Sequence, residues 1–305
     1  MRTSTFLLIL VIFFSLFATS VSASELTPLA PPSLTNVMKD NEKKAKLLAR
    51  KKKNTTTVTG SIMIDLTYKT IYTGKAVSLS RYDNVDLWVQ EVRLGEWARM
   101  ESLLALGGYE ESSGEPLFQK KKLSEVVSWF SKSPFSVING QFFDPRREIT
   151  PLSFGVKMDG IVRTAGADNR NESKNILVVE DNQARIIPYS WEALRDAPGY
   201  LAMVNLTLDK SHHRDESIGR TYICLKTPSP DNTSNTLLIF TALAMSETTL
   251  ERELPRWGCT RSGTTKLDAS GSTRLWTQGE YIFGKSHKWD PDYRKIPQYI
   301  AVWDR

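Results

Sequence analysis

Short runs of apolar and β-branched residues, each bounded by turn-forming residues, recur from residue 61 onward and constrain the fold most strongly. Runs of this kind are typical of β-strands. They are expected at residues 61–66, 85–94, 175–179, 218–226, 235–244, 264–268 and 296–303. Between them, Asp159-Gly160 and Asp181-Asn182 are typical of tight turns that join consecutive strands. The chain beyond residue 58 is therefore expected to be mainly β-structure.

Two short helices are expected among these strands. The first begins at Leu123, where apolar residues recur at the helical interval. The second covers residues 246–257, where Thr248 and Glu251 have the spacing of a capping box and Pro255 should bend or end the helix. Because strands predominate, the predicted class is α+β: a mixed, mainly antiparallel sheet with a few short helices in a single domain.

The first 23 residues have the order of a secretory signal peptide. A single cation precedes an apolar run, and Val21-Ser22-Ala23 supplies small residues at the positions that signal peptidase reads. The alternative is an uncleaved membrane anchor, but the apolar run is shorter than the roughly 20 residues that a bilayer requires. We therefore expect a secreted or periplasmic protein whose mature chain starts at Ser24.

The positive charge of the chain is concentrated before the expected domain. The net charge is +6, and residues 39–53 alone contain eight lysines and arginines against two acidic residues. Residues 24–57 also contain three prolines and no apolar period, which predicts a disordered linker before a domain at residues 58–305. The domain is electrically neutral, which argues against nucleic acid as a partner. The basic linker at residues 39–53 is either a solvated tether or a weak contact with anionic envelope surfaces.

Cysteine and histidine chemistry gives few constraints. Cys224 and Cys259 are compatible with one disulfide or with two buried thiols, and the residues alone leave both open. The pair His212-His213 has none of the usual spacings of metal ligands. No metal and no organic cofactor are expected.

A first candidate motif lies where an apolar strand ends in Asn139-Gly140-Gln141 and is followed by two phenylalanines and Asp144. A strand that ends in this way places polar side chains at the rim of a sheet. The alternative is a plain strand-to-turn transition in which Asp144 forms an Asx turn.

A second candidate motif is Asp268 followed by the small residues Ala269-Ser270-Gly271-Ser272-Thr273. Small residues allow backbone N–H groups to approach an anionic ligand. The isolated carboxyl of Asp268 is a candidate acid, base or nucleophile. The alternative is a turn with a capping aspartate.

A third candidate motif, Gly219-Arg220-Thr221, opens an apolar strand. An arginine at the mouth of a strand suits bidentate capture of a phosphate or a carboxylate. The alternative is a surface salt bridge.

Taken in order, these motifs resemble the phosphodiester glycosidase domain family. The matching segments are Asn139-Gly140-Gln141-Phe142-Phe143-Asp144, Pro151-Leu152-Ser153-Phe154-Gly155 with Asp159-Gly160, Gly219-Arg220-Thr221 and Leu267-Asp268-Ala269-Ser270-Gly271-Ser272-Thr273. The family has glycine where this chain has Gln141, Ala269 and Ser270. If these positions need a left-handed backbone, a side chain there costs about 1–2 kcal/mol.

The resemblance implies an exported hydrolase that cleaves the glycosidic bond of a sugar-1-phosphate diester in an envelope or extracellular glycan. It assigns catalytic roles to Asp268, Asp144 and Asn139. It assigns substrate binding to Arg220, Thr221, Gly140, Gln141, Ser270, Gly271, Ser272 and Thr273. The three departures from glycine leave open a non-catalytic, glycan-binding protein on the same fold.

Overall fold

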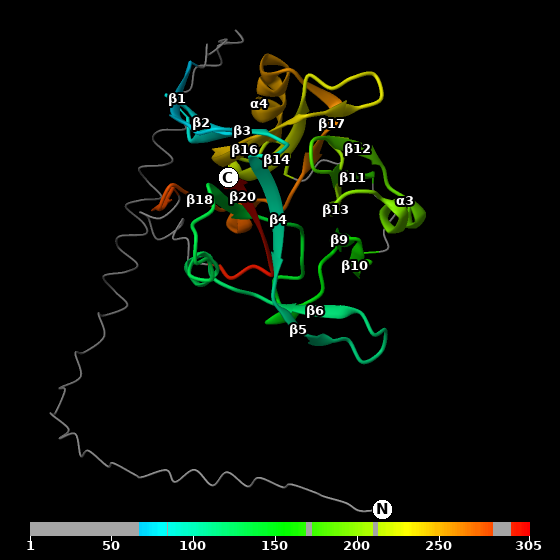
Figure 1. The fold of residues 1–305 in the computed structure, drawn as a ribbon. Helices are drawn as coiled ribbons and strands as arrows, with labels where there is room; N and C mark the ends of the chain where they lie inside the picture. Colours follow the sequence, from blue (N-terminus) through cyan, green and yellow to red (C-terminus); the bar gives the residue numbers. More distant parts are fainter. Residues whose placement is uncertain (1–66, 84, 169–172, 210–212, 283–293) are drawn as a thin grey trace, which may run out of the picture. The chain divides into compact units, whose positions relative to one another are not determined.

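Antiparallel strands make up about half of the described chain, and helices are few and short (Figure 1). The computed structural model describes residues 67–83, 85–168, 173–209, 213–282 and 294–305, which belong to the unit Ile64–Arg305. The predicted signal peptide at residues 1–23, the linker at 24–57 and the strand at 61–66 lie outside the described residues. No helix within the described ranges is long and apolar enough to cross a membrane.

The larger of two main sheets has twelve strands. Its hydrogen-bonded order is β1 (Tyr68–Thr73), β2 (Val77–Tyr82), β3 (Leu87–Arg93), β16 (Thr236–Met245), β14 (Ile218–Lys226), β17 (Cys259–Lys266), β13 (Leu201–Leu206), β11 (Lys174–Val179), β12 (Ala184–Pro188) and β15 (Thr233–Ser234). Off this path, β9 (Val156–Met158) pairs with β13 and with β10 (Ile161–Thr164). The predicted Asp159-Gly160 turn joins β9 to β10, with φ of 49° and 78°.

The second main sheet has five strands. Its order is β19 (Glu280–Tyr281), β18 (Leu275–Thr277), β7 (Ser136–Asn139), β20 (Gln298–Asp304) and β4 (Ala98–Leu104). A small third sheet of β5 (Leu106–Tyr109), β6 (Pro116–Gln119) and β8 (Ile149–Thr150) extends from the end of β4 (Figure 1).

The pairing pattern corrects one prediction about the sheet. Every ladder between the described strands is antiparallel, so the expected mixture with parallel strands is wrong for this part of the chain. Parallel neighbours need a long crossover connection, usually through a helix. The described α-helices have five to seven residues, and many strands are joined by hairpins.

The core lies between the two main sheets. Along β14, alternate side chains point to opposite faces, as the pleat of a strand requires. Ile223 and Leu225 face the five-stranded sheet and pack in one cluster with Ile138 and Ile300. Burial of this apolar interior is the main force that holds the two sheets together.

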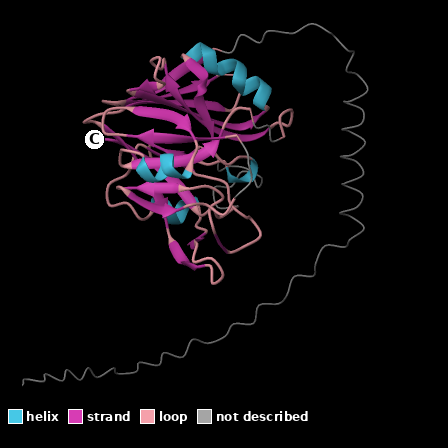
Figure 2. Cartoon of the chain, turned by 90° about the vertical axis from the view of Figure 1, so that its right-hand side faces the viewer, coloured by secondary structure: helices cyan, strands magenta, loops and turns pink. Residues whose placement is uncertain are grey.

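Short helices cover the outer faces of both sheets (Figure 2). Helix α4 (Glu247–Glu253) and the 3-10 turn η1 (Leu254–Trp257) pack on β14 and β16, and α3 (Trp191–Asp196) packs on β11 and β13. On the five-stranded sheet, α2 (Leu123–Val127) buries Leu123 and Val126 against Val137. The result is a four-layer arrangement of helix, sheet, sheet and helix.

Helix α4 begins two residues earlier than the predicted capping box. Its N-cap is Ser246, which follows β16 directly and accepts a hydrogen bond from the Thr249 N–H at 3.2 Å. The capping-box role of Thr248 and Glu251 is therefore wrong, because the helix starts as soon as the strand ends. Pro255 lies in η1 and ends the α-helix as predicted.

A disulfide joins Cys224 in β14 to Cys259 in β17, which settles the open question about the two cysteines. The bond lies on the α4 side of the large sheet, where both residues are buried. It closes a separation of 35 residues that contains all of β16 and α4.

Candidate functional site

Asn139, the last residue of β7, links the two main sheets. Its side-chain amide donates to the main-chain carbonyl of Asp268 at 2.8 Å. Its carbonyl oxygen accepts from the Thr221 hydroxyl at 2.6 Å and from the Arg274 N–H at 3.1 Å. The side chain is fully buried, so each of these bonds replaces hydration that the groups have lost. Three of the predicted motifs thus meet where β7, β14 and β17 end or begin.

Asp268 lies just beyond β17, at the junction of the two sheets. Its N–H donates to the Gly140 carbonyl at 3.1 Å, and its own carboxylate accepts from the Ala269 N–H at 2.8 Å. The residue as a whole is half-buried, and its carboxyl is enclosed by protein.

Burial raises the pKa of the Asp268 carboxyl from 3.8 to about 6. The Ser272 hydroxyl and the Ala269 N–H oppose this shift because they favour the ionised form, and the positive charges of Arg294 and Arg274 act in the same direction. A carboxyl that titrates near neutral pH is suited to proton transfer or to nucleophilic attack.

The small-residue loop after Asp268 packs closely on the start of β14. It forms the 3-10 turn η2 (Ser270–Ser272), in which Ser270 has φ 59° while the preceding Ala269 is extended at φ −129°. A Cβ on Gly219 would lie 2.6 Å from the Thr273 hydroxyl, so glycine is required for this approach. The Thr273 hydroxyl is buried and has no hydrogen-bond partner among the described residues, whereas the buried Ser272 hydroxyl lies close enough to the Asp268 carboxyl to lower its pKa.

The glutamine at position 141 is directed into the protein interior. Its side-chain amide donates to the carbonyls of Gly155 and Val204 at 3.1 and 2.9 Å, and its N–H donates to the Gln298 side chain at 2.8 Å. A Cβ on the neighbouring Gly140 would overlap the same Gln298 side chain. Gln141 therefore stabilises the end of β7 through hydrogen bonds inside the protein. Its backbone is not left-handed, so this position does not require glycine.

Asp144 lies at the surface beside a hollow of ≈ 440 Å³. The hollow is lined by Phe143, Asp144, Pro145, Arg146, Pro151, Leu152, Ser153, Ala167 and Asp168. Arg146 holds the Asp144 carboxylate through its side chain and its backbone N–H, which lowers the pKa of Asp144 to about 2. Within the described ranges no hydrogen bond or ion pair connects Asp144 to Asp268.

Arg220 faces the opposite side of the large sheet from Thr221. Its guanidinium is 1% exposed and pairs with Glu247 of α4 at 3.1 Å, and Lys266 reaches the same carboxylate at 3.3 Å. It also donates to main-chain carbonyls of Met245, His213 and Glu216. Alternation along β14 thus brings Thr221 to Asn139 and turns Arg220 toward α4, and its predicted contact with substrate stays a prediction.

Two arginines that the motifs did not single out lie on the Asp268 side. Arg274 is buried and donates to the carbonyls of Gly271 and Thr273 at 2.8 and 2.9 Å. The guanidinium of Arg294 lies over the Phe143 ring, 5.5 Å from its centroid. Arg274 directly follows the small-residue motif, so its position in the sequence could have identified it as a site residue. Arg294 lies in no recognisable motif, because its place depends on contacts with residues that are distant in the sequence.

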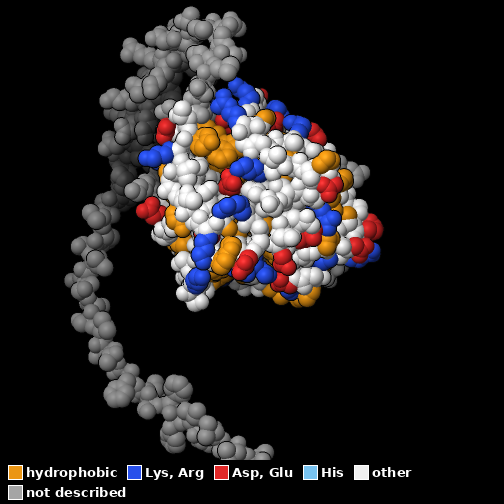
Figure 3. All heavy atoms as spheres, turned by 45° about the horizontal axis from the view of Figure 1, so that its top comes forward, with side chains coloured by type: hydrophobic (Ala, Val, Ile, Leu, Met, Phe, Trp, Pro, Cys, Tyr) orange, Lys and Arg blue, Asp and Glu red, His pale blue; other side chains and the backbone are white. Residues whose placement is uncertain are grey.

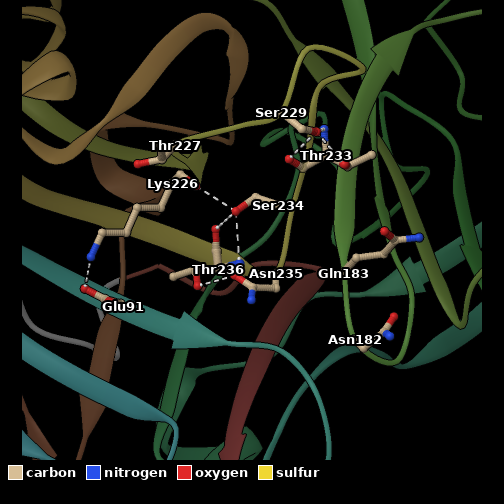
Figure 4. Close-up of a pocket in the computed structure, with 10 residues that line it drawn as sticks. All are labelled: Glu91, Asn182, Gln183, Lys226, Thr227, Ser229, Thr233, Ser234, Asn235 and Thr236. Atoms are coloured by element: carbon tan, nitrogen blue, oxygen red, sulfur yellow. Dashed lines mark hydrogen bonds and ion pairs between the residues drawn. The ribbon is translucent and has the colours of Figure 1, made fainter.

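A separate hollow of ≈ 580 Å³ lies at the other end of β14 (Figure 4). It is lined by Glu91, Asn182, Gln183, Lys226, Thr227, Ser229, Thr233, Ser234, Asn235 and Thr236. Lys226 pairs with Glu91 at 2.7 Å, and the Ser234 hydroxyl donates to the Lys226 carbonyl at 2.7 Å. None of the motif residues lines this hollow, and its polar side chains bond mainly to one another.

The charges of the described surface are mixed. Figure 3 shows basic and acidic side chains interspersed over one face. Across the described residues there is no group of three or more His, Cys, Asp or Glu side chains that could hold a metal ion. His212 of the disfavoured histidine pair lies outside the described residues.

Comparison with known proteins gives a relationship at the level of fold. No family model and no curated protein matches the sequence. The structure is similar to the zebrafish N-acetylglucosamine-1-phosphodiester alpha-N-acetylglucosaminidase catalytic domain auto-inhibited by its pro-peptide, with 13% identity, a TM-score of 0.53 and coverage of 81% of this chain and 86% of that one.

Two bacterial structures have lower scores. A hypothetical protein from Synechocystis has 11% identity and a TM-score of 0.48 over 78% of this chain and 64% of its own. A Burkholderia pseudomallei protein, described as an exported protein, has 10% identity and a TM-score of 0.42 over 74% of each chain. At these identities the likeness concerns the fold alone.

Proposed function

We propose that the protein is an exported hydrolase that cleaves the bond between the anomeric carbon and the phosphate oxygen of a sugar-1-phosphate diester. The observation that carries the proposal is the Asp268 carboxyl, with its pKa raised to about 6, beside Arg274 and Arg294 at the junction of the two sheets. A titratable carboxyl with neighbouring cations matches the two needs of this reaction, which are attack at the anomeric carbon and stabilisation of a departing anion.

The leaving group decides which form of Asp268 is useful. Cleavage on the sugar side releases a phosphate monoester, whose second pKa is roughly 6. So weak a base needs little protonation as it departs, in contrast to the alkoxide of a simple glycoside. The ionised form of Asp268 is then the active one, either as a base that takes a proton from the attacking water or as a nucleophile.

The other motif residues have supporting parts in this proposal. Asn139 positions the Asp268 loop through the main chain. Asp144 stays ionised near neutral pH, since its pKa is about 2, and so it accepts a hydrogen bond from a sugar hydroxyl without donating a proton. The backbone of residues 270–273 approaches the phosphate closely because the side chains there are small.

Two further points support the proposal. The ordered motifs resemble phosphodiester glycosidases, and the zebrafish domain with the similar fold is named for action on an N-acetylglucosamine-1-phosphodiester. Fold alone does not fix function, so the site chemistry must be tested directly.

The test is turnover by the full-length protein of methyl diesters of hexose and N-acetylhexosamine 1-phosphates, with methyl glycosides of the same sugars for comparison. We expect release of free sugar and methyl phosphate from the diesters. Asp268→Asn should lower kcat by at least about 10²-fold, the usual scale for a proton-transfer group. The matched control is Asp231→Asn, an exposed aspartate in the turn beyond the far end of β14.

Two results would contradict the proposal. Undiminished turnover by Asp268→Asn would remove that residue from the mechanism. A wild-type protein that cleaves no diester but retains glycans on an affinity matrix would favour the non-catalytic, glycan-binding alternative.

A further inference from the structure

The backbone and the side chain of Arg294 are both held beside the Asp268 loop. The Arg274 guanidinium donates to the Arg294 carbonyl at 2.9 Å, which fixes the main chain just before β20. A Cβ built on Gly271 would lie 3.2 Å from Nη1 of Arg294, so the guanidinium packs against the small-residue loop. Its other side lies over the Phe143 ring at 5.5 Å.

The charge of Arg294 acts on the Asp268 carboxyl without being neutralised by it. Among the charged groups around Asp268, Arg294 has the larger effect in lowering its pKa, ahead of Arg274. No carboxylate of the described chain lies within ion-pair distance of the Arg294 guanidinium, and the residue is half-exposed. A planar guanidinium held by an aromatic ring and backbone keeps its donors oriented for a ligand.

Arg220 and Arg294 therefore have different relations to the site. The charge of Arg220 is balanced by Glu247 on the α4 side of the large sheet. Arg274 donates from both terminal nitrogens of its guanidinium to main-chain carbonyls. Arg294 is the cation whose guanidinium lies between the Asp268 loop and the Phe143 ring that lines the hollow beside Asp144.

We infer that Arg294 binds the phosphate of the substrate and so determines the preference for phosphodiester-linked sugars over simple glycosides. The inference rests on the proposed function and names the residue of that site that selects its substrate class. Two N–H groups of the guanidinium pair with the two non-bridging oxygens of the diester, the geometry in which arginine binds phosphate most strongly. Phe143 keeps the guanidinium in place by a cation–π contact. The same charge stabilises the monoester as it departs.

The test compares Arg294→Gln and Arg294→Lys with the wild-type, full-length protein. The control is Arg81→Gln, an exposed arginine on β2, three strands from β14. Arg294→Gln should raise KM for the methyl diester of a hexose 1-phosphate by at least about tenfold, the scale of a lost charge-assisted hydrogen bond. KM for any methyl glycoside that is turned over should stay within about twofold. The KM of Arg294→Lys for the diester should lie between those of the wild type and Arg294→Gln, because lysine keeps the charge and loses the planar guanidinium.

A second measurement separates this inference from the proposed function. Binding of inorganic phosphate and of dimethyl phosphate is followed by titration calorimetry, with thermal melts to confirm that every variant is folded. We expect binding that is weakened at least about tenfold in Arg294→Gln and unchanged in Arg81→Gln.

The outcomes are distinguishable. If the wild type cleaves diesters and Arg294→Gln has the same KM, the inference is overturned and the proposed function stands. If the wild type cleaves no diester, the proposed function fails. In that case, phosphate binding that is lost in Arg294→Gln would still support an anion site at Arg294. Binding that is equal in wild type and variant, or absent from both, would overturn the anion site.

Discussion

The side-chain amide of Asn139 donates a 2.8 Å hydrogen bond to the main-chain carbonyl of Asp268, so the end of a strand in one sheet holds the loop that follows a strand of the other. The position of the Asp268 carboxyl therefore depends on how the two sheets pack. It also depends on a side chain that has no need to contact substrate.

Removal of the Asn139 side chain should destabilise the protein. Asn139→Ala leaves the Thr221 hydroxyl, the Arg274 N–H and the Asp268 carbonyl without their partner in a buried place. Each such loss costs about 1–3 kcal/mol, and the total should lower the free energy of unfolding by about 3 kcal/mol in urea titrations. The control is Asn182→Ala, in the exposed turn between β11 and β12. An unchanged urea midpoint for Asn139→Ala would show that the bonds are dispensable.

The activity should rise with pH through about 6. The pKa of Asp268 is raised to about 6, so its carboxyl is protonated below this pH and ionised above it. Since the ionised form is proposed to act, kcat/KM should increase with pH and level off above roughly 7. Asp144 titrates near 2 and should contribute no inflection in this range. A profile that instead falls above pH 6 would make the protonated carboxyl the active form.

Substitution of Arg220 should lower the stability of the fold and leave the KM for a diester unchanged. Arg220→Ala leaves Glu247 with Lys266 as its remaining described ion-pair partner in a buried place, and breaking such a pair costs about 3–5 kcal/mol. Arg220→Lys should also lower the melting temperature, because it loses hydrogen bonds to main-chain carbonyls. Its KM for a diester, measured well below the melting temperature, should match wild type. A selective rise in that KM would restore the substrate-binding role that the Gly-Arg-Thr motif predicts.

The two loop residues that replace glycines in the family pattern should respond differently to restoration of glycine. Ser270 has φ 59°, where a side chain costs about 1–2 kcal/mol, so Ser270→Gly should raise the free energy of unfolding by about 1 kcal/mol. Ala269 is extended at φ −129°, so Ala269→Gly should lower it by roughly 0.5 kcal/mol through chain entropy alone. Chemical denaturation of both variants makes the comparison. A gain in both or in neither would show that backbone conformation does not decide the difference.

Local patterns predicted several strands of the large sheet and the Asp159-Gly160 turn, but not hairpin partners such as β2 and β12. Residues 218–226 form β14 as expected, and the ranges 85–94, 175–179, 235–244 and 296–303 match β3, β11, β16 and β20 to within two residues at each end. Strand β17 begins earlier than expected, at Cys259, because Thr260, Arg261 and Ser262 are exposed and give no apolar signal. The division into two sheets depends on pairing between distant strands, which alternation within one strand does not specify.

The site was predictable in part for the same reason. Asn139, Thr221 and Asp268 come together because each motif lies at the end or the start of a buried strand. The Gly219-Arg220-Thr221 motif predicted that Arg220 binds the phosphate. The direction of this side chain depends on which face of β14 packs against α4, and a motif does not specify that face. Arg294 has no local motif, and its place beside the Asp268 loop depends on contacts with Arg274 and Phe143, which are distant in the sequence.

Strand β20 is the last described strand along the chain, yet it lies between β7 and β4 and pairs with both. Ribosomes add residues from the N-terminus onward, so β7 and β4 are made long before the strand that joins them. The five-stranded sheet, and with it the junction that holds Asp268 and Arg294, has no complete form until residue 304 has been synthesised. A partly made chain therefore lacks the strand that completes this sheet and the junction beside it.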